Sequence, residues 1–165
     1  MKRLYLIGGP MGVGKTAVCR ELQKRLDRSV FLDGDWCWDA HPFQVTEETK
    51  TMVMENICFL LNNFLRCSAY DHVIFCWVLH QQAVLDSLLS RLDVRDREVR
   101  AVSLTASPEA LTARIEKDIQ AGRRDRGALE RSLAYLPLYA ALNAETLDIS
   151  GLAPAEAARR LEALA

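Results

Sequence analysis

One segment of the chain fits the pattern GxxxxGK[ST] at every defined position: Gly9-Pro10-Met11-Gly12-Val13-Gly14-Lys15-Thr16. A short apolar run at residues 4–7 precedes it, and residues 15–26 carry apolar side chains at helical spacing. The glycines let the backbone curl so that successive N–H groups surround a phosphate, and the start of the helix adds partial positive charge. A plain turn would not need a lysine and a hydroxyl there. The segment therefore predicts a nucleoside-triphosphate site.

The same loop predicts which residues bind the nucleotide and its metal ion. Lys15 is long enough to reach the β- and γ-phosphates, which makes it a candidate catalytic residue, and the Thr16 hydroxyl is a hard ligand suited to Mg²⁺. The predicted cofactors are ATP and Mg²⁺. The predicted nucleotide-binding residues of the loop are Gly9, Met11, Gly12, Val13, Gly14, Lys15 and Thr16.

Beyond the loop, short apolar runs alternate with longer stretches of helical periodicity. We expect strands at residues 4–7, 30–32, 72–79, 99–104 and 146–149. The helices expected between and after them cover residues 15–26, 46–65, 82–92, 107–120, 127–143 and 154–164. Strands separated by helices predict an α/β fold, a parallel sheet with helices on both faces, formed by one domain over residues 1–165.

Two carboxylates follow the second expected strand, in the segment Asp33-Gly34-Asp35. Ligands of open parallel sheets collect beyond the carboxyl ends of the strands, so both side chains would face the crevice of the glycine loop. One of the two carboxylates could hold Mg²⁺ through water, and the other could accept the proton of a substrate hydroxyl. The alternative is an Asp-Gly turn that leads into a helix cap.

Aromatic residues come next, and their role stays open between two interpretations. Trp36, Trp38 and Phe43 would either wall an acceptor pocket or pack into the core, and His41 among them is a poorer base than Asp35. His80, at the end of the third expected strand, would either reach the site or cap the next helix.

A polar segment at residues 121–131 is rich in arginine and has Gly122 and Gly127 as potential hinges. We expect a lid that brings one of its arginines, Arg123, Arg124 or Arg126, onto the transferring phosphate, where it would stabilise charge and exclude water. The alternative is a solvated helix end with weak surface ion pairs.

Composition excludes several classes of protein. The chain has 21 Lys and Arg against 22 Asp and Glu, a net charge of −1, which argues against a protein that coats nucleic acid. No apolar stretch is long enough to span a membrane. The five cysteines form no CxxC pair, which is typical of buried thiols in a reducing cytoplasm.

The sequence resembles the P-loop small-molecule kinases of the P-loop NTPase superfamily, a group that includes shikimate kinase, gluconate kinase and chloramphenicol phosphotransferase. The resemblance rests on the glycine loop, on residues 31–35, which are similar to the Asp-x-Asp of shikimate kinases, and on residues 109–114. It implies the strand order 2-3-1-4-5, Mg²⁺ support by Asp33, an acceptor contact by Asp35 and stacking of Arg114 on adenine. It also implies a short helical lid in which Arg123 or Arg124 is the arginine that closes on the phosphate. The loop at residues 150–154 would lie on the adenine side.

The chain also departs from shikimate kinases. Residues 78–81 replace their glycine-rich motif, and no arginine follows the second strand to bind a carboxylate. The aromatic residues suit a less charged acceptor.

The resemblance implies a cytoplasmic enzyme, monomer or homodimer, that transfers the γ-phosphate of ATP to a hydroxyl of a small molecule. Neither nucleic acid nor membrane is an expected partner. A nucleotide or nucleoside kinase is one alternative, although residues 36–65 offer only Lys50 as a cation for a monophosphate. A nucleotide-binding switch or ATPase without an acceptor is another.

Overall fold

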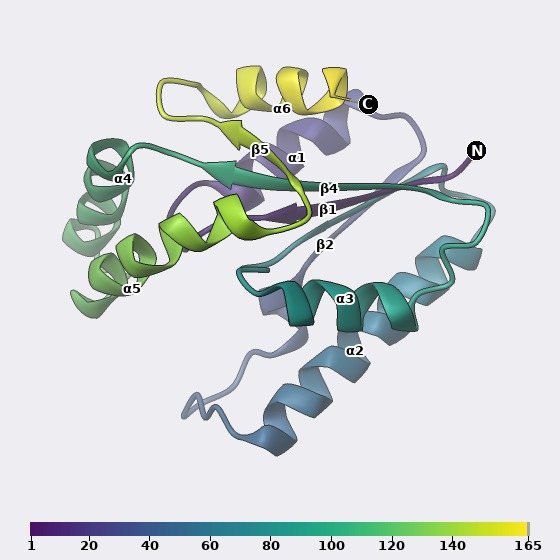
Figure 1. Ribbon diagram of the computed structural model, residues 1–165, viewed down its shortest axis with the longest axis horizontal. Helices are drawn as coiled ribbons and strands as arrows, with labels where there is room; N and C mark the ends of the chain where they lie inside the picture. Colours follow the sequence, from purple (N-terminus) through teal and green to yellow (C-terminus); the bar gives the residue numbers. More distant parts are fainter. Residues whose placement is uncertain (165) are drawn as a thin grey trace.

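The computed structural model describes residues 1–164 and contains one sheet of five parallel strands (Figure 1). The strands run in the order β2-β3-β1-β4-β5, which confirms the predicted fold class. Because β1 is central, the glycine loop that follows it lies in the middle of the sheet's carboxyl edge. The strands are β1 (Arg3–Gly8), β2 (Ser29–Asp33), β3 (His72–Cys76), β4 (Glu98–Thr105) and β5 (Glu145–Asp148).

Helices cover both faces of the sheet, and the alternation of side chains along β1 explains why. Tyr5 and Ile7 point into a core with α1, α4 and α6, whereas Leu4 and Leu6 point into a second core with α2 and α3. Figure 1 shows α1 and α6 on one side of the strands and α2 and α3 on the other. The α-helices are α1 (Lys15–Arg25), α2 (Glu47–Arg66), α3 (Gln82–Arg91), α4 (Pro108–Gln120), α5 (Gly127–Tyr135) and α6 (Pro154–Ala163).

The third strand ends three residues earlier than its apolar run predicts. β3 stops at Cys76, and Leu79 adopts a positive φ of 39°, which extended chain does not allow. Its neighbour β2 ends at Asp33, the partner of Cys76 in the register. After β3, Trp77, Val78 and His80 line the cavity described below, and Leu79 is buried in the second core.

The helix expected at residues 127–143 is also shorter than predicted. α5 ends at Tyr135, and the 3₁₀ helix η2 (Leu136–Ala141) follows it with Pro137 in its first turn. Proline has no N–H to continue an α-helical ladder, and its ring clashes with the preceding turn. A second 3₁₀ helix, η1 (Gly34–Cys37), follows β2 directly. None of the helices within residues 1–164 is long and apolar enough to cross a membrane.

Candidate active site

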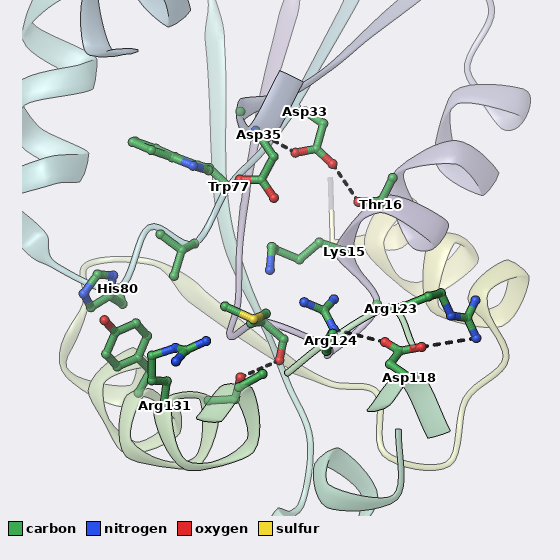
Figure 2. Close-up of a pocket in the computed structure, with 18 of the residues that line it drawn as sticks. Lys15, Thr16, Asp33, Asp35, Trp77, His80, Asp118, Arg123, Arg124 and Arg131 are labelled. Atoms are coloured by element: carbon green, nitrogen blue, oxygen red, sulfur yellow. Dashed lines mark hydrogen bonds and ion pairs between the residues drawn. The ribbon is translucent and has the colours of Figure 1, made fainter. Parts of the chain in front are cut away.

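A cavity of about 1270 Å³ opens where the segments that follow β1, β2 and β3 meet (Figure 2). The glycine loop, the η1 segment, the turn after β3 and the α4–α5 region all contribute to its lining. Sequence reasoning placed the crevice at this edge, and the structure brings most of the predicted residues together there. Those among the lining residues are Met11, Gly12, Gly14, Lys15, Thr16, Asp33, Asp35, Arg123 and Arg124.

The glycine loop is shaped by positions that tolerate no side chain. Gly12 has φ 81°, and a Cβ there would lie 2.5 Å from a side-chain carbon of Ile115. Gly9 has φ 151°, and its Cβ would lie 2.7 Å from the Leu104 carbonyl oxygen. The loop is thus held between α4 and β4, so its N–H groups have a defined direction before any ligand arrives.

Lys15 is the first residue of α1, and its amine bends back over the loop. The Nζ atom donates to the carbonyl oxygens of Gly9 at 2.9 Å and Pro10 at 3.0 Å. Burial lowers the pKa of this amine, and the nearby Asp35 and Asp33 carboxylates act in the opposite direction. An arriving polyphosphate would replace the two neutral carbonyls with charged oxygens, which are stronger partners for an ammonium group.

Thr16 and Asp33 form one oxygen-rich unit. The Thr16 hydroxyl donates to one carboxylate oxygen of Asp33 at 2.6 Å, and the other oxygen accepts the backbone N–H of Asp35 at 3.0 Å. Asp33 is 6% exposed, so its carboxylate is fixed. Hard oxygens of this kind, completed by substrate phosphates, are what Mg²⁺ prefers, and the pair fits that ion. No group of three or more His, Cys, Asp or Glu side chains suited to a metal occurs within residues 1–164.

Asp35 lies in η1 and faces the cavity from the side opposite the glycine loop (Figure 2). Burial raises the pKa of its carboxyl, and the neighbouring Asp33 raises it further. Lys15, the adjacent Trp77 side chain and Arg124 lower it. A partly buried carboxylate near cations, yet destabilised as an anion, is suited to accept a proton.

The two lid arginines differ in direction. Both pair with Asp118 of α4, Arg124 at 3.1 Å and Arg123 at 3.4 Å. The Arg124 side chain is 30% exposed and lies beside Lys15, whereas that of Arg123 is 64% exposed and points away from Lys15 in Figure 2. Of the two predicted alternatives, Arg124 has the geometry to reach a phosphate held by the loop.

Arg114 of α4 ties the glycine loop to the turn after β5. Its guanidinium donates to the carbonyl oxygens of Val13 at 2.9 Å, Ile149 at 2.7 Å and Ser150 at 3.1 Å. It is not a lining residue of the cavity. Its stacking on adenine stays a prediction, and its contacts give it an added structural part in joining these two loops.

The aromatic residues after β2 divide between the two interpretations. Trp38 and Phe43 line the cavity and contact each other, with ring centroids 4.4 Å apart. Trp36 does not line it: its ring packs on Phe31, and the Arg20 guanidinium lies 5.0 Å from the ring centroid. His41 is exposed and outside the lining as well.

Other lining residues escaped the sequence analysis. Trp77 lies beside Asp35, and Arg131 of α5 points into the cavity (Figure 2). His80, by contrast, was predicted either to reach the site or to cap the next helix. It lines the cavity and stacks on Tyr135 with ring centroids 4.2 Å apart, and the N-cap of α3 is Gln81. The only available signal was their position after a strand or in the expected lid, which does not tell a lining side chain from a packed one.

A protein-family model described as an AAA domain matches residues 6–133 of the sequence. The chain belongs to this AAA-domain family. The matched range runs from β1 through the glycine loop to α5, so it contains nearly all of the cavity's lining. A search of curated protein sequences finds no significant match to this AAA-domain chain.

Solved structures share the whole fold. The tunicamycin resistance protein of Deinococcus radiodurans is 21% identical with a TM-score of 0.72, covering 99% of this chain and 95% of that one. A gluconokinase from Sinorhizobium meliloti is 17% identical with a TM-score of 0.68 and coverages of 98% and 95%. Shikimate kinase from Acinetobacter baumannii, solved with shikimate, is 21% identical with a TM-score of 0.63 and coverages of 99% and 92%. The AAA-domain chain therefore has a kinase-like P-loop fold, as its motifs predicted.

Proposed function

We propose that this protein transfers the γ-phosphate of ATP to a hydroxyl group of a small molecule. The observation that carries the proposal is the position of Asp35, which faces Lys15 and the glycine loop across one cavity. A base aimed at the phosphate site is what an enzyme with an acceptor hydroxyl needs, and a simple nucleotide-binding module does not need it. The names of the similar solved structures, a gluconokinase and a shikimate kinase, support a kinase.

The nucleotide side of the cavity supplies charge. Lys15 and the N–H groups of the glycine loop would neutralise the β- and γ-phosphates, and Arg124 would close on the γ-phosphate from the lid. Thr16 and Asp33 would hold Mg²⁺, which offsets phosphate charge when bound. Phosphoryl transfer depends on such positioning and electrostatic stabilisation more than on covalent help from the protein.

The opposite side would receive the acceptor. Asp35 would accept the hydroxyl proton as the acceptor oxygen attacks the γ-phosphorus, and ADP would leave with the electrons of the broken bond. Trp38 and Phe43 offer aromatic surface there, and Val45 extends it to the rim, where Phe43 and Val45 are each 60% exposed. We infer an acceptor with a substantial apolar part. Burying apolar surface against these side chains favours binding, and the side chains offer few hydrogen-bond partners to a polar acceptor.

A panel of hydroxyl compounds tests the proposal. The purified chain is incubated with Mg-ATP and one compound at a time, from polar sugar acids and nucleosides to uncharged compounds with apolar rings, and ADP release and phosphorylated product are measured. We expect product with a member of the last group. Tight ATP binding without stimulation by any compound would favour the nucleotide-binding switch. Stimulation by nucleosides or nucleoside monophosphates alone would favour the nucleotide kinase.

Asp35→Asn provides the matched control. It keeps the size of the side chain and removes the base, so product formation should fall while ATP binding persists. A variant that forms product at the rate of the unchanged protein would contradict the part given to Asp35.

A further inference from the structure

Trp77 is the first residue after β3, and the transfer proposed above gives it no part. Its backbone N–H donates to the Ile7 carbonyl oxygen at 3.1 Å, so its main chain is still fixed by the central strand. Its side chain lines the cavity beside Asp35. The structure thus places an indole ring, with its N–H donor, beside the proposed base on fixed backbone.

The indole packs directly on the backbone of Gly34. A Cβ at position 34 would lie 2.6 Å from both Cγ and Cδ1 of the Trp77 ring and 3.0 Å from its Cβ. The Cδ1 atom is bonded to Nε1, so the N–H edge of the indole lies against the segment that carries Asp35. Figure 2 shows the nitrogen side of the ring turned toward the Asp35 carboxylate. Gly34 thus makes room for this approach, which no other residue type would allow without moving the ring.

The surroundings of Asp35 show what the contact would do. The Trp77 indole is the neutral donor beside this carboxylate and lowers its pKa, as Lys15 and Arg124 do through their charge. A carboxylate drawn fully onto Lys15 would form an ion pair and turn away from an acceptor. A neutral indole N–H engages one lone pair, and the remaining lone pairs of the two carboxylate oxygens stay available.

We propose that Trp77 is a positioning residue, whose indole N–H holds the Asp35 carboxylate toward the acceptor side of the cavity. The inference rests on the proposed function, since it concerns the orientation of the base. Trp77 itself touches no reacting atom. Gly34 contributes to this positioning because its lack of a side chain lets the indole pack directly on the segment that carries Asp35.

Nuclear magnetic resonance of the full chain tests the contact without turnover. The ¹⁵N-labelled protein gives one indole N–H signal from each of its three tryptophans, assigned with the variants Trp36→Phe, Trp38→Phe and Trp77→Phe. At one neutral pH, Asp35→Ala should move the Trp77 signal upfield and speed its exchange with solvent, because the acceptor is lost. The Trp36 signal, which comes from outside the cavity, should not move. An unmoved Trp77 signal would overturn the proposal.

Gly34→Ala is the second variant, because it leaves both partners in place and displaces only the ring. It should move the Trp77 signal in the same direction as Asp35→Ala, while the Trp36 signal stays fixed. A Trp77 signal that keeps its position and slow exchange in Gly34→Ala would contradict the close approach over Gly34.

Turnover separates positioning from a structural role. In Mg-ATP hydrolysis with water as acceptor, Trp77→Phe should lower kcat on the order of 10-fold with an unchanged KM for ATP, since only orientation is lost. Trp36→Phe, at the surface, should leave both values unchanged. If the unchanged protein hydrolyses ATP and Trp77→Phe has the same kcat, the positioning role of Trp77 is contradicted, while the proposed function stands. If neither Mg-ATP hydrolysis nor the acceptor panel gives turnover, the proposed function fails, and with it the role of Trp77, whatever the indole signals show.

Discussion

The two sides of the cavity are built in different ways. The nucleotide side is made of backbone and buried groups: the glycine loop is confined by Ile115 and Leu104, and Asp33 is held by Thr16. The acceptor side is made of side chains, most of them from residues 35–45, with Phe43 exposed at its rim. The first is rigid before any ligand arrives. The second is free to differ among chains that share the loop, which is how one fold serves many acceptors.

Lys15→Ala should have the largest effect, because it removes the main cation of the nucleotide side. The ammonium is the proposed partner of the β- and γ-phosphates, so its loss should lower kcat/KM for ATP by at least about 10³-fold. Steady-state kinetics measures the loss of turnover, and titration with a fluorescent ATP analogue measures the loss of ATP affinity. Full ATP affinity and full turnover in the variant would exclude Lys15 from the phosphate site.

Asp35→Asn should separate the two sides. Transfer to the acceptor should fall by about 10²-fold, the range of a lost general base, while ATP affinity stays near that of the unchanged protein. The acceptor panel and the same ATP titration provide both readings. A fall in ATP affinity as large as the fall in transfer would assign Asp35 to the nucleotide side instead.

Arg124→Ala and Arg123→Ala form a matched pair in the lid. Arg124 lies beside Lys15, so its removal should lower the transfer rate by about 10-fold to 10²-fold, and Arg123→Ala should cost much less because its side chain points away from Lys15. Single-turnover transfer rates at saturating ATP compare them. Equal losses in the two variants would indicate that the lid rearranges when ATP binds.

The same contrast explains what the sequence could predict. The glycine loop, Thr16 and Asp33 follow from motif and strand order, because a phosphate cradle needs defined residue types at fixed spacing. The acceptor wall has no such rule. Trp36 and Trp38 are two residues apart in similar sequence, yet only Trp38 lines the cavity, since the turn at η1 sends Trp36 onto Phe31.

Element ends follow the same logic. β3 ends at Cys76, level with the end of its neighbour β2, and α5 ends before Pro137 while the apolar pattern continues. Periodicity reports burial, and both segments remain partly buried after their regular structure stops. Arg131 was not singled out because the apolar pattern of residues 127–143 predicts a helix but not which of its polar side chains turns toward a cavity.

Trp38→Ala should sharpen the description of the acceptor side. It removes ring surface from the proposed wall and should raise KM for an apolar acceptor by about 10-fold, which corresponds to about 1.4 kcal/mol, with KM for ATP unchanged. Trp36→Ala removes an equal ring outside the cavity and should change neither value. Steady-state kinetics with the acceptor found in the panel measures both. Equal effects of the two substitutions would place the acceptor elsewhere.

Tyr139→Phe should have the smallest effect, on the support of the acceptor side. Tyr139 of η2 is fully buried, and its hydroxyl donates to the Val78 carbonyl oxygen at 2.6 Å, which fixes the turn between Trp77 and His80. Removing one such hydrogen bond should lower the free energy of unfolding by about 1 kcal/mol, because Val78 keeps the Gly9 N–H at 3.3 Å as a partner. Urea denaturation measures the change.

Tyr70→Phe serves as the control for that loss. Tyr70 packs edge-on against Phe64 at the far end of α2, so its hydroxyl should contribute within about 0.5 kcal/mol of zero. The indole signal of Trp77 adds a local reading, since a loosened turn should broaden it in Tyr139→Phe and leave it sharp in Tyr70→Phe. Equal stability losses in both variants, with a sharp Trp77 signal, would mean that the turn after β3 is held by the sheet alone and that η2 only covers it.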